Sequence, residues 1–290
     1  MAAEPGLRIG ISGAPASTLR SGSHHAVARC RALGIDALEM AWVHSVTLTE
    51  AAGRRVRAAA AAHDVALSVH APYYINLNSA EPDKRADSIA RIVRAGQAAA
   101  WAGARNVVLH LAWYHADAPA EVLNRVADGL AEASARLASL GVVVGRDVVL
   151  RPEVMGRRSQ FGDLDEVLAL CRRVSGTAPC IDIAHLHART GGWNAPAAFD
   201  ALWDTVVGAL GPAALDDVHV HISGIAYGPE GEKKHLPFGE ADLDYRGFLA
   251  SLHARGARGL VIVESPARED DVLLLMDAWA GLAGSTEADG

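Results

Sequence analysis

Histidines and acidic residues recur at the ends of short apolar runs in this sequence. A run that ends at Val69 is followed at once by His70, and the same arrangement returns further along the chain. The complete set is His70, His110, Glu153, Asp182, His185, His219, His221 and Glu264, with His235 in the loop after the run at 218–223. Neutral imidazoles mixed with carboxylates are the ligands that zinc and similar divalent metals prefer. The sequence therefore predicts a metal centre, provided that these runs end at one place in the fold.

Each of these residues also has an ordinary structural explanation. A single histidine at a strand end is usually a hydrogen-bonded structural residue. Glu153 and Glu264 are harder to explain in this way, because a buried carboxylate without a partner is very costly. With roughly eight such residues on one predicted face, a metal site is the better interpretation. The histidines expected at the surface are His24, His25, His44, His63, His115 and His253.

The elements that must position these residues are eight short runs rich in Val, Ile and Leu, each short enough for a buried strand. They cover residues 7–12, 37–42, 66–72, 106–112, 148–154, 180–185, 218–223 and 260–265. Segments with helical spacing lie between them, for example 51–64 and 87–103. Eight strand–helix units predict an α/β fold, a (β/α)₈ TIM barrel, in which the carboxyl ends of all strands meet on the face that carries active sites. A doubly wound sheet is less favoured, because no Gly-x-Gly-x-x-Gly turn follows the first run.

Composition limits the other possibilities. No linker or composition break divides the chain, so we expect one TIM-barrel domain over residues 1–283 and a disordered polar tail over 284–290. The three cysteines, Cys30, Cys171 and Cys180, lack disulfide or metal spacing, and no run is long enough for a membrane span, which together predict a cytoplasmic protein. The net charge of -7 does not favour nucleic-acid binding. Bound divalent cations, however, supply positive charge that a count of residues omits.

The order of the motifs resembles the endonuclease IV (deoxyribonuclease IV) family, the zinc-dependent apurinic/apyrimidinic endonucleases of the xylose-isomerase-like TIM barrel superfamily. The matching segments span residues 66–266 and read SVHAPYYINL, VVLHLAWY, RPEVMGRRSQFG, CIDIAHLHA, VHVHISG, KKHLPFGE and VIVESP. This resemblance implies a monomeric DNA-repair enzyme that binds double-stranded DNA with abasic sites. It also implies hydrolysis of the phosphodiester 5′ to the abasic site, with Glu153 as the catalytic carboxylate.

The resemblance further implies two or three zinc ions, with manganese as another possible metal. One ion would be held by His70 and His110, with Glu153 bridging to a second ion. The ligands that complete the second site would be Asp182, His221 and Glu264. His219 is an alternative to His221, because both side chains lie on one face of the same strand.

The third zinc site is where this sequence departs from the family. His185 and His235 would hold the ion, and the family places an Asp two residues before the second of these histidines. Here that position is Lys233, and Glu232 is the candidate replacement if the loop shifts. Candidates for substrate binding are Tyr73, Asn76, Arg157 and Lys233.

Two rival functions remain open at this point. A sugar isomerase or epimerase of the same superfamily would use one metal, held by Glu153, Asp182, His219 or His221, and Glu264. That function does not require His70, His110, His185 and His235 together, and this surplus favours the nuclease. A protein that binds damaged DNA without cutting it is the third possibility, and only Lys233 favours it.

Overall fold

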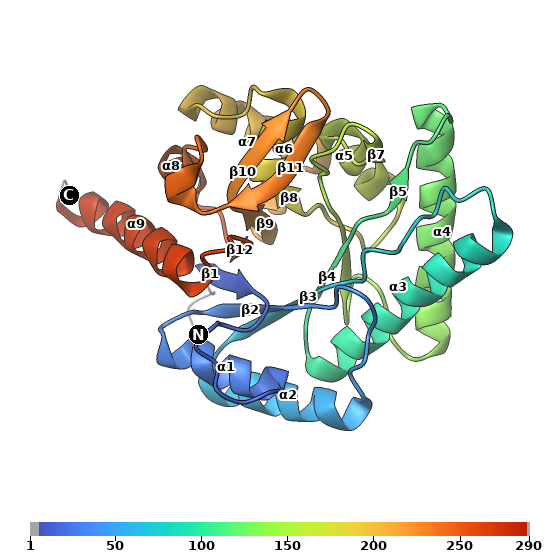
Figure 1. The fold of residues 1–290 in the computed structure, drawn as a ribbon, viewed down its shortest axis with the longest axis horizontal. Helices are drawn as coiled ribbons and strands as arrows, with labels where there is room; N and C mark the ends of the chain where they lie inside the picture. The colour runs from blue at the N-terminus through green and yellow to red at the C-terminus, as the bar shows by residue number, and fades with distance from the viewer. Residues whose placement is uncertain (1–5, 289–290) are drawn as a thin grey trace.

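Eight parallel strands form one curled sheet in the computed structural model, which describes residues 6–288, with side chains up to residue 282 (Figure 1). The order of strands in the sheet is β6-β4-β3-β2-β1-β12-β9-β8, so the first and last strands of the chain are neighbours. The strands are β1 (Leu7–Ser12), β2 (Ala37–Ala41), β3 (Ala66–His70), β4 (Asn106–Leu109), β6 (Val149–Pro152), β8 (Ile181–Asp182), β9 (Val218–Ile222) and β12 (Gly259–Val263). The predicted TIM-barrel fold is confirmed.

The barrel closes between β6 and β8 through single bridges rather than a continuous ladder. Leu150 pairs with Thr177, and Glu153 pairs with Cys180, both in parallel. Backbone hydrogen bonds nonetheless cross this seam, from Ala178 to Leu150, from Cys180 to Pro152 and from Val154 to Cys180.

Helices cover the outside of the sheet, as the alternating sequence pattern predicts (Figure 1). They are α1 (Ser23–Ala32), α2 (Glu50–His63), α3 (Pro82–Ala102), α4 (Pro119–Ser139), α5 (Leu164–Arg173), α6 (Ile183–Thr190), α7 (Pro196–Leu210), α8 (Tyr245–Ala254) and α9 (Glu269–Ala288), with short 3₁₀ turns η1 (Pro212–Leu215) and η2 (Phe238–Glu240). Local signals set several boundaries. Asp163 and Glu166 form a capping box at the start of α5, and Gly103 ends α3 in the left-handed conformation.

The sequence predicted a single strand over residues 180–185, and this prediction is wrong. Strand β8 covers only two residues of it, and α6 begins at Ile183. The reason is local, because Oδ1 of Asp182 accepts a hydrogen bond of 2.7 Å from the backbone N–H of His185 and so caps the helix. His185 consequently lies in the first turn of a helix, not at the end of a strand.

Two small antiparallel pairs were not predicted. Strand β5 (Ala112–Trp113) pairs with β7 (Gln160–Phe161), and β10 (Gly224–Gly228) forms a hairpin with β11 (Gly231–Leu236). His235 therefore belongs to a strand rather than to a loop. At the other end of the chain, α9 continues to Ala288, into the segment expected as a polar tail, and residues 289 and 290 lie outside the described part.

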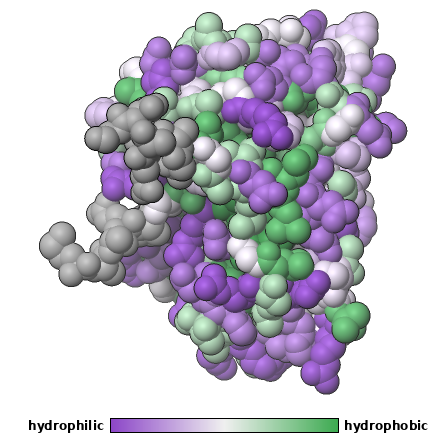
Figure 2. Space-filling view, turned by 90° about the vertical axis from the view of Figure 1, so that its left-hand side faces the viewer, coloured by the Kyte–Doolittle hydropathy of each residue, from purple (hydrophilic) through white to green (hydrophobic). Residues whose placement is uncertain are grey.

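The side of the molecule that carries α9 and α1 has a mixed surface, with a strip of hydrophobic side chains among hydrophilic ones (Figure 2). Among residues 6–288, no helix has the length and apolar character that crossing a membrane requires.

Candidate metal centre

Glu153 lies at the centre of the predicted site. It follows β6 directly, and its carboxylate is fully buried. Its Oε2 lies 2.8 Å from Nε2 of His110 and 3.2 Å from Nε2 of His70. His70 ends β3 and His110 follows β4; in the sheet β4 lies next to β6, and β3 lies next to β4. Three consecutive strands of the sheet thus deliver one group of two imidazoles and a carboxylate.

The other oxygen of Glu153 faces a second group. Its Oε1 lies 3.2 Å from Nδ1 of His221, and the same Nδ1 is 3.6 Å from Oε1 of Glu264. Together with Asp182, these residues offer four ligand atoms within 4.8 Å of one another. Glu153 is shared between this group and the first one. His221, rather than His219, occupies this position.

A third group forms around His185. Its Nδ1 lies 3.2 Å from Oδ2 of Asp182, and its Nε2 lies 3.3 Å from Nε2 of His235. Asp182, His185 and His235 can offer three ligand atoms to one ion. The sequence had assigned Asp182 only to the second group, and the capped start of α6 explains why it also reaches this one.

The structure places Glu232 toward the third group and Lys233 toward solvent. Oε2 of Glu232 is 3.5 Å from Nε2 of His185, whereas Lys233 is exposed. A β-bulge is responsible, because Ala226 pairs with Lys234 but Tyr227 pairs with Glu232, which leaves Lys233 as the extra residue. Alternation in a regular strand would put residues 233 and 235 on one face. The bulge brings residue 232 to that face instead.

Glu39 is the buried residue of this region that sequence reasoning missed. It stands in the middle of β2 and is not exposed at all. Its Oε2 accepts hydrogen bonds from Ser68 at 2.8 Å and from His219 at 3.1 Å, and its Oε1 lies 3.0 Å from Nε2 of His221. This last contact is an ion-pair distance whose angle does not meet hydrogen-bond geometry. The signal was present, because a carboxylate inside an apolar strand must have a partner.

The pKa values of the buried groups reflect these contacts. Burial opposes ionisation of Glu153, but the charges of His110 and His221 hold the pKa of that carboxyl well below its usual range. Burial lowers the pKa of His70, yet the hydrogen bond and charge of Glu153 raise it to about 9. Burial raises the pKa of Asp182 to about 6 against the opposing charge of His185, with Glu153 adding to the rise. The cluster therefore requires positive charge to hold its buried carboxylates together.

The residues present fit divalent metal ions. The donor set consists of imidazole nitrogens and carboxylate oxygens, and Glu153 and Asp182 are each shared by two groups. Oδ2 of Asp182 is buried and has no hydrogen-bond partner among the described residues, as expected of an oxygen that a cation completes. A further group of Cys180, His219 and His221 lies deeper in the barrel.

The predicted substrate-binding residues differ in their surroundings. Tyr73 is 46% exposed, and its ring stands 5.1 Å from the ring centroids of both His70 and His110. Arg157 is exposed, and its backbone pairs with Gly231 at the hairpin. The side chain of Asn76, in contrast, is already hydrogen-bonded, because its Oδ1 accepts a 3.1 Å hydrogen bond from the backbone N–H of Asn78. Asn76 therefore has a structural role in its turn.

Comparison with known families agrees with this architecture. The model of the family described as "Xylose isomerase-like TIM barrel" matches residues 27–282. The chain belongs to this family. The sequence is similar to that of an uncharacterized protein of Methanocaldococcus jannaschii. The two are 36% identical over 274 residues, and the alignment covers 94% of this chain and 97% of the relative.

Two solved structures resemble the chain in fold. Endonuclease IV from Thermus thermophilus superimposes with a TM-score of 0.75 at 20% identity, covering 96% of this chain and 99% of the enzyme. A D-tagatose 3-epimerase-like protein superimposes with a TM-score of 0.70 at 18% identity, covering 97% of this chain and 99% of that protein. The same fold thus occurs in proteins named for two reaction classes, and any choice between these classes must come from the site.

Proposed function

We propose that this protein is a zinc-dependent apurinic/apyrimidinic endonuclease of the endonuclease IV type. Its substrate would be double-stranded DNA with an abasic site, cleaved at the phosphodiester 5′ to that site in base excision repair. The observation that carries the proposal is the number of convergent ligands. Three overlapping groups share one buried space, and an enzyme with a single metal needs only one of them. We further propose that the protein acts in the cytoplasm as a monomer.

Each group has a distinct set of residues that would hold an ion. The sets are His70, His110 and Glu153; Glu153, Asp182, His221 and Glu264; and Asp182, His185, His235 and the nearby Glu232. Zinc ions bound there would supply Lewis acidity and positive charge toward a phosphodiester. The groups overlap at Glu153 and Asp182, so the ions would lie close to one another.

The chain's own residues then have separable tasks. Glu153 presents both carboxylate oxygens to the centre of the cluster, which suits it to serve two ligand groups and to orient a water molecule beside them. Tyr73 packs its ring edge against His70 at the rim and would exclude bulk water from that side. Arg157 and Lys233 are exposed cations beside the hairpin and would contact DNA phosphates.

A second candidate function has one observation in its favour. Glu153, Asp182, His221 and Glu264 alone form a complete four-residue group, which is sufficient for a one-metal sugar epimerase. The epimerase-like neighbours in the family make this reading the chief rival. An epimerase with one metal would not need His70, His110 and His235 near the same group. For that reason we favour the nuclease.

The decisive experiment uses a duplex that carries one tetrahydrofuran abasic analogue. We expect a single cut 5′ to the analogue, loss of cutting with a chelator, and recovery when zinc is restored. An intact duplex of the same sequence is the control. D-tagatose, incubated in parallel and followed by chromatography, tests the rival. Epimerisation of the sugar without cleavage of the duplex would replace our proposal with the epimerase.

A further inference from the structure

Arg189 lies near the end of α6, one helical turn after His185. Residues four apart on a helix lie on the same face, so both side chains point in one direction from α6. His185 belongs to the third ligand group, and the guanidinium of Arg189 reaches the 154–160 segment, which joins Glu153 to β7. Arg189 is half-buried, and its contacts indicate a role beside the candidate metal centre.

The guanidinium of Arg189 binds three backbone oxygens of the 154–160 segment. Its Nη1 lies 2.6 Å from the carbonyl oxygen of Arg157, 3.1 Å from that of Gln160 and 3.4 Å from that of Met155. A planar guanidinium presents its donors in a rigid fork, so it fixes several acceptors relative to one another. One side chain therefore fixes the path of this segment at three points.

Tyr114 secures both Arg189 and the segment. Its hydroxyl accepts a hydrogen bond of 3.2 Å from Nη2 of Arg189 and donates to the carboxylate of Glu166, which belongs to the capping box of α5. Its backbone N–H donates to the carbonyl oxygen of Ser159 at 3.1 Å. The segment is thus tied to both α5 and α6, and the Arg189 guanidinium is held on its other side.

The 154–160 segment borders the third ligand group. The carbonyl oxygen of Gly156 accepts a 3.1 Å hydrogen bond from the backbone N–H of Glu232. A Cβ atom on Gly156 would lie only 2.7 Å from Cβ of Glu232 and 3.0 Å from Cδ2 of His185, so the backbone of the segment packs directly against both residues. The position of the segment therefore sets how closely Glu232 approaches His185.

The same segment also carries Arg157, the exposed cation to which the proposed function assigns a DNA contact. Arg157 pairs with Gly231, and the backbone N–H of Arg158 donates to the carbonyl oxygen of Glu230 at 3.2 Å. The segment and the β10–β11 hairpin therefore form one unit, and Arg189 joins that unit to α6.

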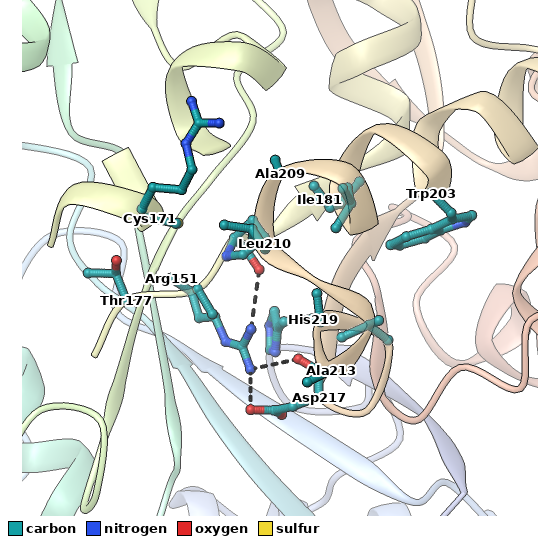
Figure 3. A pocket seen from close by; sticks show the side chains of 16 residues that line it. Arg151, Cys171, Thr177, Ile181, Trp203, Ala209, Leu210, Ala213, Asp217 and His219 are labelled. Atoms are coloured by element: carbon teal, nitrogen blue, oxygen red, sulfur yellow. Dashed lines mark hydrogen bonds and ion pairs between the residues drawn. The ribbon is translucent and has the colours of Figure 1, made fainter. Parts of the chain in front are cut away.

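Arg151 makes similar contacts at a place where they serve the barrel itself. It is 1% exposed, and its guanidinium donates to Oδ1 of Asn106 at 2.9 Å. It also donates to the backbone oxygen of Asp217 at 3.0 Å and pairs with the carboxylate of that residue at 2.9 Å (Figure 3). These partners begin β4 and precede β9, so Arg151 fixes strand ends. The backbone partners of Arg189 lie instead between Glu153 and β7, beside the ligand groups.

We propose that Arg189 is a positioning residue of the candidate metal centre. It holds the 154–160 segment so that Gly156 keeps Glu232 against the third ligand group and Arg157 faces the DNA. Arg189 acts through the segment and is itself neither a ligand nor a DNA contact. The part that concerns DNA rests on the proposed function, whereas the placement of the segment and of Glu232 does not.

Hydrogen exchange of the metal-free protein, followed by mass spectrometry, tests the placement of the segment. In the Arg189→Met protein, which keeps an apolar stem without donors, the amides of residues 154–160 should exchange at least about tenfold faster than in the wild type. Arg255→Met is the matched control, because Arg255 is also half-buried and binds a backbone oxygen, that of Asp200 between α7 and α8. Unchanged exchange in Arg189→Met protein, or equal acceleration of this segment in both variants, would overturn the proposal.

Tyr114→Phe keeps the proposal testable if the methionine variant does not fold. It removes the hydroxyl that holds Arg189 and should accelerate exchange of the same amides. Thermal melting checks that each variant is folded. Wild-type exchange in both Tyr114→Phe and Arg189→Met protein would exclude the network as the support of the segment.

Zinc affinity is a second readout that does not depend on DNA. Chelator competition should show that Arg189→Met weakens the binding of one ion about tenfold, as expected when a residue that supports a ligand is lost. In the Glu232→Ala background, Arg189→Met should add little, because both changes act on the same contact. Fully additive losses would mean that Arg189 does not act through Glu232, and they would overturn this role.

Steady-state kinetics on the abasic duplex test the link to Arg157. Arg157→Gln should raise KM up to about fivefold, the value of an exposed ion pair, and should leave KM unchanged in the Arg189→Met background. Equal increases in both backgrounds would exclude an action of Arg189 through Arg157. Absence of cleavage by the wild-type protein would reject the proposed function, and the exchange and zinc measurements would then decide this inference by themselves.

Discussion

The Glu39 carboxylate lies 3.0 Å from Nε2 of His221, while Nδ1 of the same ring faces Glu153 and Glu264. A carboxylate behind an imidazole favours the tautomer with the proton on the nitrogen that it faces. The opposite nitrogen is then free to bind a metal. Glu39 thus sets which atom His221 presents to the centre, although Glu39 belongs to none of the four candidate ligand groups.

Replacing Glu39 by Gln should lower zinc affinity by roughly 10–100-fold, the usual effect of losing such a partner. The reason is that an amide does not fix the His221 tautomer in the same way. Chelator competition measures the affinity. Ser68→Ala, which removes one hydrogen bond to Glu39 but does not touch His221, is the control and should have a smaller effect. Equal affinities in wild type and Glu39→Gln would exclude this role.

Metal analysis of the purified protein should find roughly two to three divalent ions per chain, with zinc among them. The reason is that three overlapping groups converge on one space. Plasma emission spectrometry after extensive dialysis measures the content. A single ion per chain would instead favour the epimerase reading.

Replacing Glu153 by Gln should nearly abolish cleavage and leave the fold intact. A neutral amide lacks the negative charge with which the Glu153 carboxylate would serve two ligand groups at once. The cleavage rate on the abasic duplex and the circular dichroism spectrum measure the two effects. Retention of more than about a tenth of the rate, about 1.4 kcal/mol in barrier, would argue against a central role.

The exchange of roles between Glu232 and Lys233 predicts opposite effects of two neighbouring substitutions. Glu232→Ala should reduce cleavage and remove the ion beside His185, because Glu232 faces that ring. Lys233→Ala should keep the ion and mainly change the salt dependence of DNA binding. Anomalous diffraction at the zinc edge locates the ion. Loss of the ion in Lys233→Ala protein, with retention in Glu232→Ala protein, would reverse the assignment.

Acid stability should depend on Glu269, at the start of α9. Burial raises its pKa, but hydrogen bonds from the backbone N–H groups of Ala16 and Ser17 lower it to about 2. A carboxyl whose pKa is lower in the folded state stabilises the protein above its unfolded pKa of about 4.5, and this contribution disappears as the pH falls toward 2.

Glu269→Gln should therefore lower the urea midpoint at pH 6 and have little effect near pH 2. Asp270→Asn, at the exposed neighbouring position, should change the midpoint little at either pH. Equilibrium unfolding followed by tryptophan fluorescence at several pH values measures the midpoints. An equal loss at both pH values would mean that the carboxylate charge is not responsible.

The sequence by itself determined the barrel and most of the residues that gather in the candidate ligand groups. Eight apolar runs located the eight strands, and the barrel rule placed His70, His110, Glu153 and Glu264 at the strand ends that meet, together with either His219 or His221. These predictions needed only the position of each residue within its own strand, because the carboxyl ends of all barrel strands lie on one face. Asp182 and His185 were found for the same reason, although the helix that begins between them was not predicted.

Only the tertiary structure decided the features that depend on pairing across the chain. The bulge at Lys233 arises from the register of two hairpin strands, and one extra residue exchanges which side chain faces the site. The contact of Glu39 with His219, 180 residues further along the chain, requires β2 and β9, which are not neighbours in the sheet, to approach each other inside the barrel. The periodicity of apolar residues cannot predict these contacts, because each depends on how elements far apart in the sequence pair or pack.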